Sequence, residues 1–79
     1  MTDHQLKIWP EFFAKLADGT KTFEVRRNDR GFKMGDVLWL HEWSEAEGYT
    51  GMIERRVVVY LVDLSRLGCH GFVAMEVRK

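Results

Sequence analysis

The densest group of polar side chains in this sequence lies in the segment 19–30. Thr22, Glu24 and Arg26 alternate with Phe23 and Val25, as the side chains on the two faces of a strand do. If the two apolar residues face the core, the polar row stands on the opposite face. Lysine, carboxylate and guanidinium groups in such a row can hold an anionic or amide-bearing ligand. The alternative is a solvated strand face with cross-strand ion pairs, each worth less than about 1 kcal/mol.

Lys21 lies at the entrance of this strand, and three arginines lie at its other end. Arg26, Arg27 and Arg30 fall within five positions, although the whole chain balances twelve basic against twelve acidic residues. A guanidinium group fits phosphate with two parallel hydrogen bonds and stacks on bases. The cluster is therefore a candidate phosphate contact. A solvated turn that is fixed by Asn28 and its neighbour Asp29 is the alternative.

A carboxylate in the last strand is the third candidate group. Glu76 shares a strand face with Phe72 and Ala74, where a charge needs a cation or hydrogen bonds to compensate its desolvation. We expect Lys21 or Arg26 to be that partner. A Lys–Glu pair in a cleft is a candidate proton-transfer pair, but it is also a common structural ion pair.

One helix and several strands must position these groups. Apolar residues recur at helical spacing at Trp9, Phe12, Phe13, Leu16 and Ala17. Pro10 suits a first helical position and Gly19 the left-handed residue past the end, which predicts a helix from about residue 9 to residue 18. Strand patterns follow at 22–26, 36–43, 53–64 and 72–78, with a weaker one at 5–8 and loops at 44–52 and 65–71.

These elements predict an α+β fold in one domain that spans residues 1–79. Short strands in this number leave edges unless they curl shut, which favours a small β-barrel of about five strands with the helix packed beside it. A domain of this size buries only about 60% of its unfolded surface, so we expect the three Trp and five Phe to pack in the core first.

Composition excludes several classes of protein. The chain is 46% hydrophobic and 13% aromatic, which is too apolar for a disordered protein, and no segment approaches the length of a membrane span. One cysteine and three scattered histidines offer no zinc site, so we expect neither a metal nor a cofactor. The sequence opens without a signal-peptide pattern, and a cytoplasmic, reducing compartment is expected.

An ordered set of short motifs resembles the DUF3850 family, a branch of the ASCH domains in the PUA-like superfamily. The motifs are Trp9–Phe13, Gly19–Arg26, Asn28–Arg30, Phe32-Lys33, Gly35-Asp36, Glu42-Trp43, Gly48–Gly51 and Val73–Glu76. The resemblance implies a small barrel with a helix beside it and, between them, a cleft that binds RNA or a nucleotide-like small molecule. Lys21, Glu24, Arg26 and Glu76 would line that cleft. Arg27 and Arg30 would contact phosphate, and Thr22 and Asn28 are further candidates for ligand binding.

The same resemblance leaves two other functions open. Related ASCH proteins hydrolyse the acetyl amide of N4-acetylcytidine nucleosides, and their lysine and glutamate match Lys21 and Glu76. Their threonine falls at Glu24, which would position a water as general base in such an amidohydrolase. The third alternative is a non-catalytic protein-interaction module. The sequence leaves the choice of RNA, DNA or free nucleoside open, and it does not predict the oligomeric state.

Overall fold

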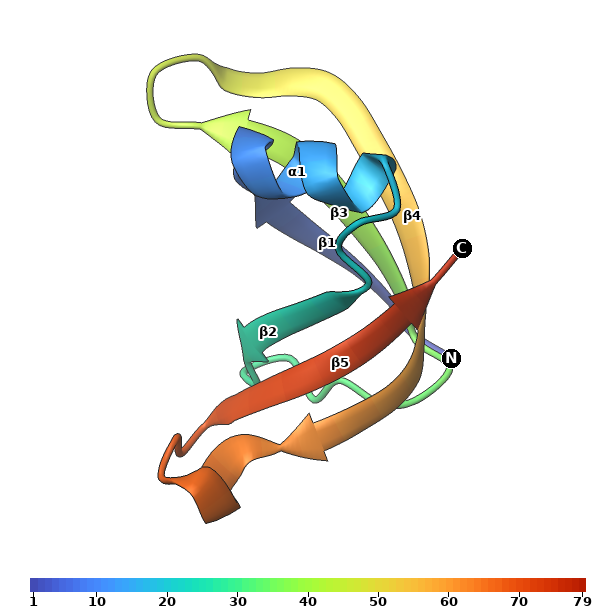
Figure 1. The fold of residues 1–79 in the computed structure, drawn as a ribbon, viewed down its shortest axis with the longest axis vertical. Coiled ribbons are helices and arrows are strands. Elements are labelled where there is room, and N and C mark those ends of the chain that lie inside the picture. Colours follow the sequence, from blue (N-terminus) through green and yellow to red (C-terminus); the bar gives the residue numbers. More distant parts are fainter.

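Five strands form one sheet that curls into half a barrel (Figure 1). The structure, a computed structural model, describes residues 1–79. The strands are β1 (Asp3–Ile8), β2 (Phe23–Arg27), β3 (Val37–Ser44), β4 (Gly48–Asp63) and β5 (Phe72–Arg78). Their order is β1-β3-β4-β5-β2, with β1 parallel to β3 and the other neighbours antiparallel. The two edge strands, β1 and β2, therefore lie at the open side of the half-barrel.

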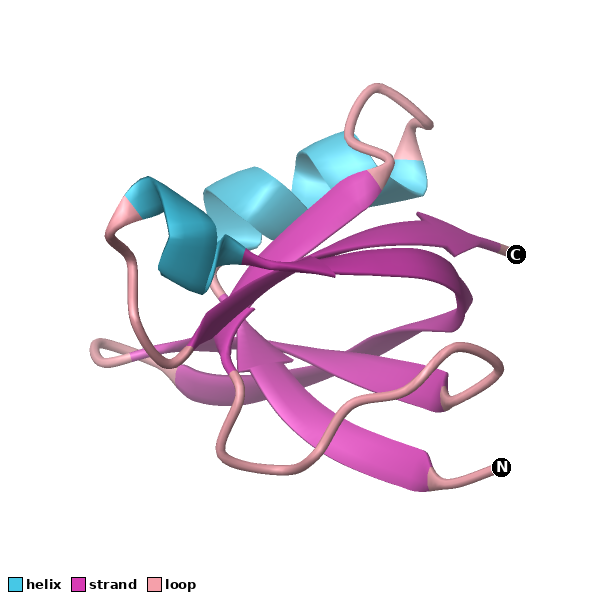
Figure 2. Ribbon diagram, turned by 90° about the horizontal axis from the view of Figure 1, so that it is seen from below, coloured by secondary structure: helices cyan, strands magenta, loops and turns pink.

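The longest strand, β4, joins the two halves of the sheet. Its first part pairs with β3 as far as Val57, and its second part pairs with β5 from Val57 onward. The register shifts between Val58 and Tyr60, and such a bulge increases the local bend and twist of a strand. Figure 2 shows how the bent strands wrap around the interior. The bend brings the two edge strands round toward one another.

The helix α1 (Pro10–Ala17) covers one end of the half-barrel, against β3 and β4 (Figure 1). Pro10 occupies its first turn, and Gly19 follows its end with a φ of +87°, a conformation that glycine adopts without steric cost. Phe13 and Leu16 point inward and join the hydrophobic core. The remaining core residues are Leu6, Ile8, Phe32, Leu38, Leu40, Val58, Val73, Met75 and Val77.

A buried arginine fastens the end of this helix to β4. Arg56 donates from Nη2 to the carbonyl of Leu16 at 2.9 Å and from Nη1 to the carbonyl of Arg55 at 2.8 Å, and it pairs with Glu54 at 2.7 Å. The last carbonyls of a helix lack partners within the helix, so this contact satisfies one of them. It also fixes the position from which the chain turns into β2.

A second buried polar network holds the loop between β2 and β3. The carboxylate of Asp36 accepts from the backbone N–H groups of Thr2 at 3.1 Å and Lys33 at 3.0 Å, and it pairs with Nε2 of His4 at 2.9 Å. The ring of His4 packs on Phe32 with 4.6 Å between centroids. These contacts tie the loop that carries Arg30 to the start of β1.

Several predictions of secondary structure are confirmed, and one is wrong. The helix, the last strand and the weak strand near the N-terminus all form. The expected loop at 44–52 instead contains the start of β4, with only a short turn at 45–47 between β3 and β4. The loop at 65–71 holds part of a short 3-10 helix, η1 (Leu64–Leu67). The predicted combination of one main helix with about five strands is confirmed, although the sheet encloses only half a barrel.

Candidate functional site

A groove lies at the open side of the half-barrel, between β1 and β2. It consists of two hollows, of about 800 Å³ and 560 Å³, that share Lys7 and Arg26 and so adjoin one another. We call the larger hollow the basic end and the smaller one the aromatic end. Both volumes fall within the range that is usual for sites that bind small molecules.

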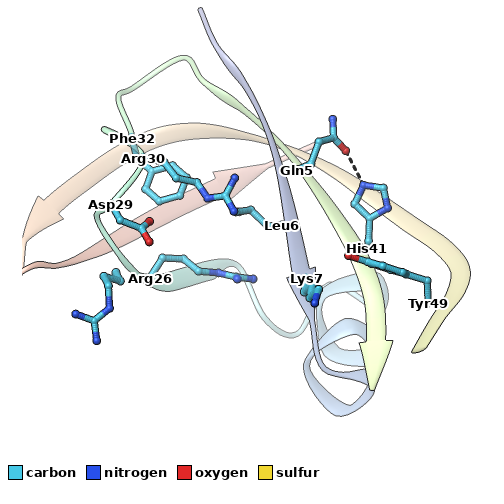
Figure 3. Close-up of a pocket in the computed structure, with 10 residues that line it drawn as sticks. Gln5, Leu6, Lys7, Arg26, Asp29, Arg30, Phe32, His41 and Tyr49 are labelled. Carbon is cyan, nitrogen blue, oxygen red and sulfur yellow. Dashed lines mark hydrogen bonds between the residues drawn. The ribbon is translucent and has the colours of Figure 1, made fainter. Parts of the chain in front are cut away.

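Cationic side chains dominate the basic end (Figure 3). The residues that line it are Gln5, Leu6, Lys7, Arg26, Arg27, Asp29, Arg30, Phe32, His41 and Tyr49. Figure 3 shows Arg26 and Arg30 extending from β2 and the following loop toward β1. His41 bonds to Gln5 at 2.6 Å on the opposite wall. Guanidinium groups that point into one hollow from adjacent segments are well placed to bind an anion.

Aromatic rings dominate the other end of the groove. Trp9 and Phe12 stack on each other with 6.0 Å between centroids and an angle of 22°, and Phe23 and Trp43 complete the wall. The Nζ atom of Lys7 lies 4.3 Å from the centre of the Trp43 ring, at the junction of the two ends. Such rings offer flat apolar faces on which a planar ligand can stack.

A buried carboxylate organises the cations of the aromatic end. Glu24 is only 3% exposed, and its two oxygens are held by different partners: Oε1 by Nζ of Lys21, and Oε2 by Nε of Arg26 at 2.9 Å. The Nζ atom of Lys21 also donates to the carbonyl of Phe23. One anion between two cations leaves a single net positive charge, and it fixes both cationic groups at the edge of the groove.

The turn before β2 is itself held by hydrogen bonds. The backbone N–H of Thr20 donates to Asp18 at 2.8 Å, and the backbone N–H of Lys21 donates to the carbonyl of Lys15 at 2.9 Å. Hydrogen bonds from the side chain and backbone of Thr20 hold the pKa of Asp18 below its usual value. These hydrogen bonds therefore fix the position of Lys21 at the edge of the groove.

The structure brings most of the predicted site residues to the groove. Lys21, Glu24 and Arg26 meet at the aromatic end, and Arg26, Arg27 and Arg30 meet at the basic end. The alternation along β2 is confirmed, but the expected orientation of its apolar side chains is wrong. Phe23 and Val25 are 53% and 51% exposed, whereas Glu24 is buried. The reason is the register, which places Glu24 beside the buried Met75 on the inner face of the sheet.

Three predicted residues lie outside the groove. Glu76 pairs in register with Phe23, on the face opposite to Glu24, and it bonds to Arg78 at 3.1 Å instead of to Lys21 or Arg26. The side chain of Asn28 accepts from the backbone N–H of Phe32 at 3.0 Å and so holds the loop. Thr22 is exposed and lines neither end. The expected pairing of Glu76 with a cation of the site is therefore wrong.

Sequence reasoning missed the aromatic wall. Trp9 and Phe12 were expected in the core, yet they are 55% and 45% exposed. The eight-residue helix has room to bury only Phe13 and Leu16, and that shortness is the signal that two more large rings on the same stripe would remain outside. Nothing in the sequence around Lys7, which lies on an edge strand, indicated that this residue lines the groove.

Two further observations concern metals and membranes. No group of three or more His, Cys, Asp or Glu residues is arranged to hold a metal ion. None of the helices has both the length and the apolar character that a membrane crossing requires.

The fold and the groove together define a small half-barrel domain whose open side carries a groove with a basic end and an aromatic end. Residues 3–77 match the family model described as "Domain of unknown function (DUF3850)", and the chain belongs to this family. It is also similar to the "Uncharacterized 12.9 kDa protein in GpA 3'region" of Escherichia phage P2. The two are 34% identical over 64 residues, which cover 81% of this chain and 55% of the phage protein. The chain thus spans about half the length of that relative.

Proposed function

We propose that this protein binds RNA or a nucleotide-like ligand in the groove between β1 and β2. One observation carries the proposal: a hollow rich in arginine adjoins a hollow walled by aromatic rings. A nucleotide has the matching parts, because its phosphate is an anion and its base is a flat π-system. Stacking of bases on aromatic side chains together with phosphate contacts is how many proteins bind single-stranded nucleic acid.

The local charge supports this proposal. Five basic residues line the groove against two acidic ones, although the whole chain has a formal net charge of zero. The basic residues are Lys7, Lys21, Arg26, Arg27 and Arg30, and the acidic ones are Glu24 and Asp29. The cationic excess is therefore a property of the groove and not of the surface in general.

The resemblance to ASCH domains of the PUA-like superfamily supports the same function. The half-barrel with one helix at its end is compatible with that fold, and the groove contains Lys21, as the resemblance implies. The amidohydrolase alternative has less support, because Glu76 lies on the opposite face of the sheet and each oxygen of Glu24 already binds a cation. We therefore propose binding and not hydrolysis.

The direct test measures the affinity of the protein for a fluorescent single-stranded RNA by anisotropy at several salt concentrations. With two to four phosphate contacts, we expect log K to fall with log salt with a slope of about −1.5 to −3. Arg30→Ala should weaken binding and make this slope shallower by about 0.7, because it removes one contact with phosphate.

The matched control is Arg78→Ala. Arg78 is an exposed arginine that pairs with Glu76 outside the groove, so its removal should leave both the affinity and the salt slope unchanged. A salt response that is flat for the unmodified protein, or equal losses in the two variants, would contradict the proposal.

A further inference from the structure

The groove contains a second set of polar groups, which belongs to the backbone of β2. In an antiparallel pair, alternate residues exchange hydrogen bonds with the neighbour, and the residues between them point their N–H and C=O groups the other way. The carbonyl of Thr22 accepts from Val77 at 2.9 Å, and the N–H of Asn28 donates to Gly71 at 2.7 Å. The even-numbered residues of β2 thus face β5, and the odd-numbered ones face the open side.

This alternation leaves Val25 with an N–H donor and a C=O acceptor at the aromatic end. β2 has β5 as its single neighbour in the sheet, and Val25 lines the hollow although its side chain is half exposed on the outer face. The odd-numbered neighbour Phe23 behaves as expected, since its carbonyl accepts from Lys21 within the same hollow. No hydrogen bond from a side chain, turn or loop reaches the N–H or the C=O of Val25.

We infer that the backbone of Val25 binds the Watson–Crick edge of a nucleobase that stacks against the aromatic wall. This inference rests on the proposed function and specifies how the ligand is held. A Watson–Crick edge places a hydrogen-bond acceptor next to a donor, which matches the adjacent N–H and C=O of one strand residue. The phosphate of the same nucleotide would reach the basic end, where Arg26 adjoins both hollows.

The inference narrows the class of ligand. A base within a duplex has its Watson–Crick edge already paired, so the groove would accept an unpaired base in single-stranded RNA or in a free nucleotide. Every base offers a neighbouring donor and acceptor, so the contact would reject duplexes more strongly than it selects one base. A peptide strand could also pair with a free strand edge, but it would not use both the cationic excess and the flat rings.

The first experiment compares the four nucleoside 5′-monophosphates, their counterparts methylated on the Watson–Crick edge, and ribose 5-phosphate, by calorimetry or by NMR titration. For the nucleotide that binds most tightly, methylation should lower the affinity about tenfold, which is the usual effect of losing one such hydrogen bond. Ribose 5-phosphate should bind more weakly still, through the basic end alone.

The second experiment uses Val25→Pro, which removes the free N–H and no hydrogen bond of the sheet, a substitution that an edge strand tolerates. It should weaken nucleotide binding about tenfold and leave ribose 5-phosphate unaffected. Ribose 5-phosphate is therefore the internal control, because it lacks the base that the backbone of Val25 would bind. If the proline variant does not fold, NMR of the unmodified protein tests the inference instead. The amide resonance of Val25 should shift, and the hydrogen exchange of this amide should slow, when the nucleotide binds.

The outcomes separate this inference from the proposed function. If methylated nucleotides or ribose 5-phosphate bind as tightly as the nucleotides, or if the Val25 amide does not respond, the inference is overturned while nucleotide binding stands. If an extended peptide perturbs the Val25 amide and neither nucleotides nor single-stranded RNA bind, both are overturned in favour of strand addition. If neither nucleotides nor single-stranded RNA bind at all, the proposed function fails and the inference fails with it.

Discussion

At the scale of single residues, the buried carboxylate of Glu24 is the centre of the site. A buried charge is tolerated when it is paired, and removal of one partner leaves the others desolvated without compensation. Here the partners are Lys21 and Arg26, which lie near each other and would repel without the anion between them. Glu24 therefore serves as the common anchor of two cations at the edge of the groove.

Glu24→Ala should lower the free energy of unfolding by about 2–3 kcal/mol, less than a fully buried pair because both cations retain some contact with water. Urea denaturation measures this loss. Glu76→Ala is the matched control, since that carboxylate pairs with Arg78 at the surface, and its removal should cost less than about 0.5 kcal/mol. Equal losses in the two variants would show that Glu24 does not anchor the cluster.

Asp36 gives a second prediction at this scale, for the stability of the folded protein at low pH. Burial raises the pKa of Asp36, but hydrogen bonds from His4, Lys33 and Thr2 outweigh burial and hold it below its ordinary value of 3.8. A depressed pKa in the folded state stabilises the protein above the unfolded-state pKa, and that stability is lost as pH falls through the folded-state pKa. The loss should therefore begin below about pH 4.

Thermal unfolding between pH 7 and pH 2.5 tests this prediction. Asp36→Asn should be less stable than the unmodified protein at pH 7, and the two curves should converge as the pH falls, because the variant has no carboxylate to protonate. Asp18 and Asp63, whose pKa values are also lowered, remain in both proteins, so their contributions cancel in the comparison. A difference in stability that stays constant with pH would refute the assignment.

At the scale of elements, the site depends on where the end of α1 is held. Arg56 reaches from β4 to the carbonyl of Leu16, and the stacked rings of Trp9 and Phe12 stand on the same helix. A shift of the helix would move the aromatic wall against β2. The hydrogen bond from Arg56 to Leu16, which lies outside the groove, therefore helps to hold the aromatic wall in place.

Arg56→Met should destabilise the protein by about 2–3 kcal/mol, because hydrogen bonds from a charged group are among the stronger ones and the Leu16 carbonyl loses its partner. Hydrogen exchange at the amide of Lys21, which bonds to Lys15, should also become faster. Arg55→Met, a change on an exposed neighbour, is the control and should alter neither measurement. If the two variants have equal effects, Arg56 does not anchor the helix.

The elements also show which features could be predicted from the sequence. The helix was predictable because Pro10 and Gly19 mark its two ends and apolar residues recur at helical spacing, and β5 because its alternation is regular. The start of β4 was not, because Gly48 and Gly51 are typical of loops. Both have positive φ values, of 71° and 91°, that the strand accommodates near its turn. This segment forms a strand because it pairs with β3, and that pairing cannot be predicted from the local composition.

At the scale of the whole molecule, the position of a strand in the sheet decides which of its side chains point to the inner side. Sequence alternation correctly grouped Glu24 with Arg26, but it assigned the inner side to Phe23 and Val25. On an edge strand of a half-barrel the inner side opens onto a groove, so polar residues can face inward, and the register with β5 decides the matter. Register and strand order are long-range properties, which a single sequence does not display.

Two unpaired strand edges also expose the domain to unwanted association with other chains. Proteins commonly protect such edges with positively charged side chains, which repel an approaching copy. Lys7 on β1 and Arg26 and Arg27 on β2 are placed to do so here. The cations that we propose as phosphate contacts would then also keep copies of the protein apart, and neutralising them would carry a risk of aggregation.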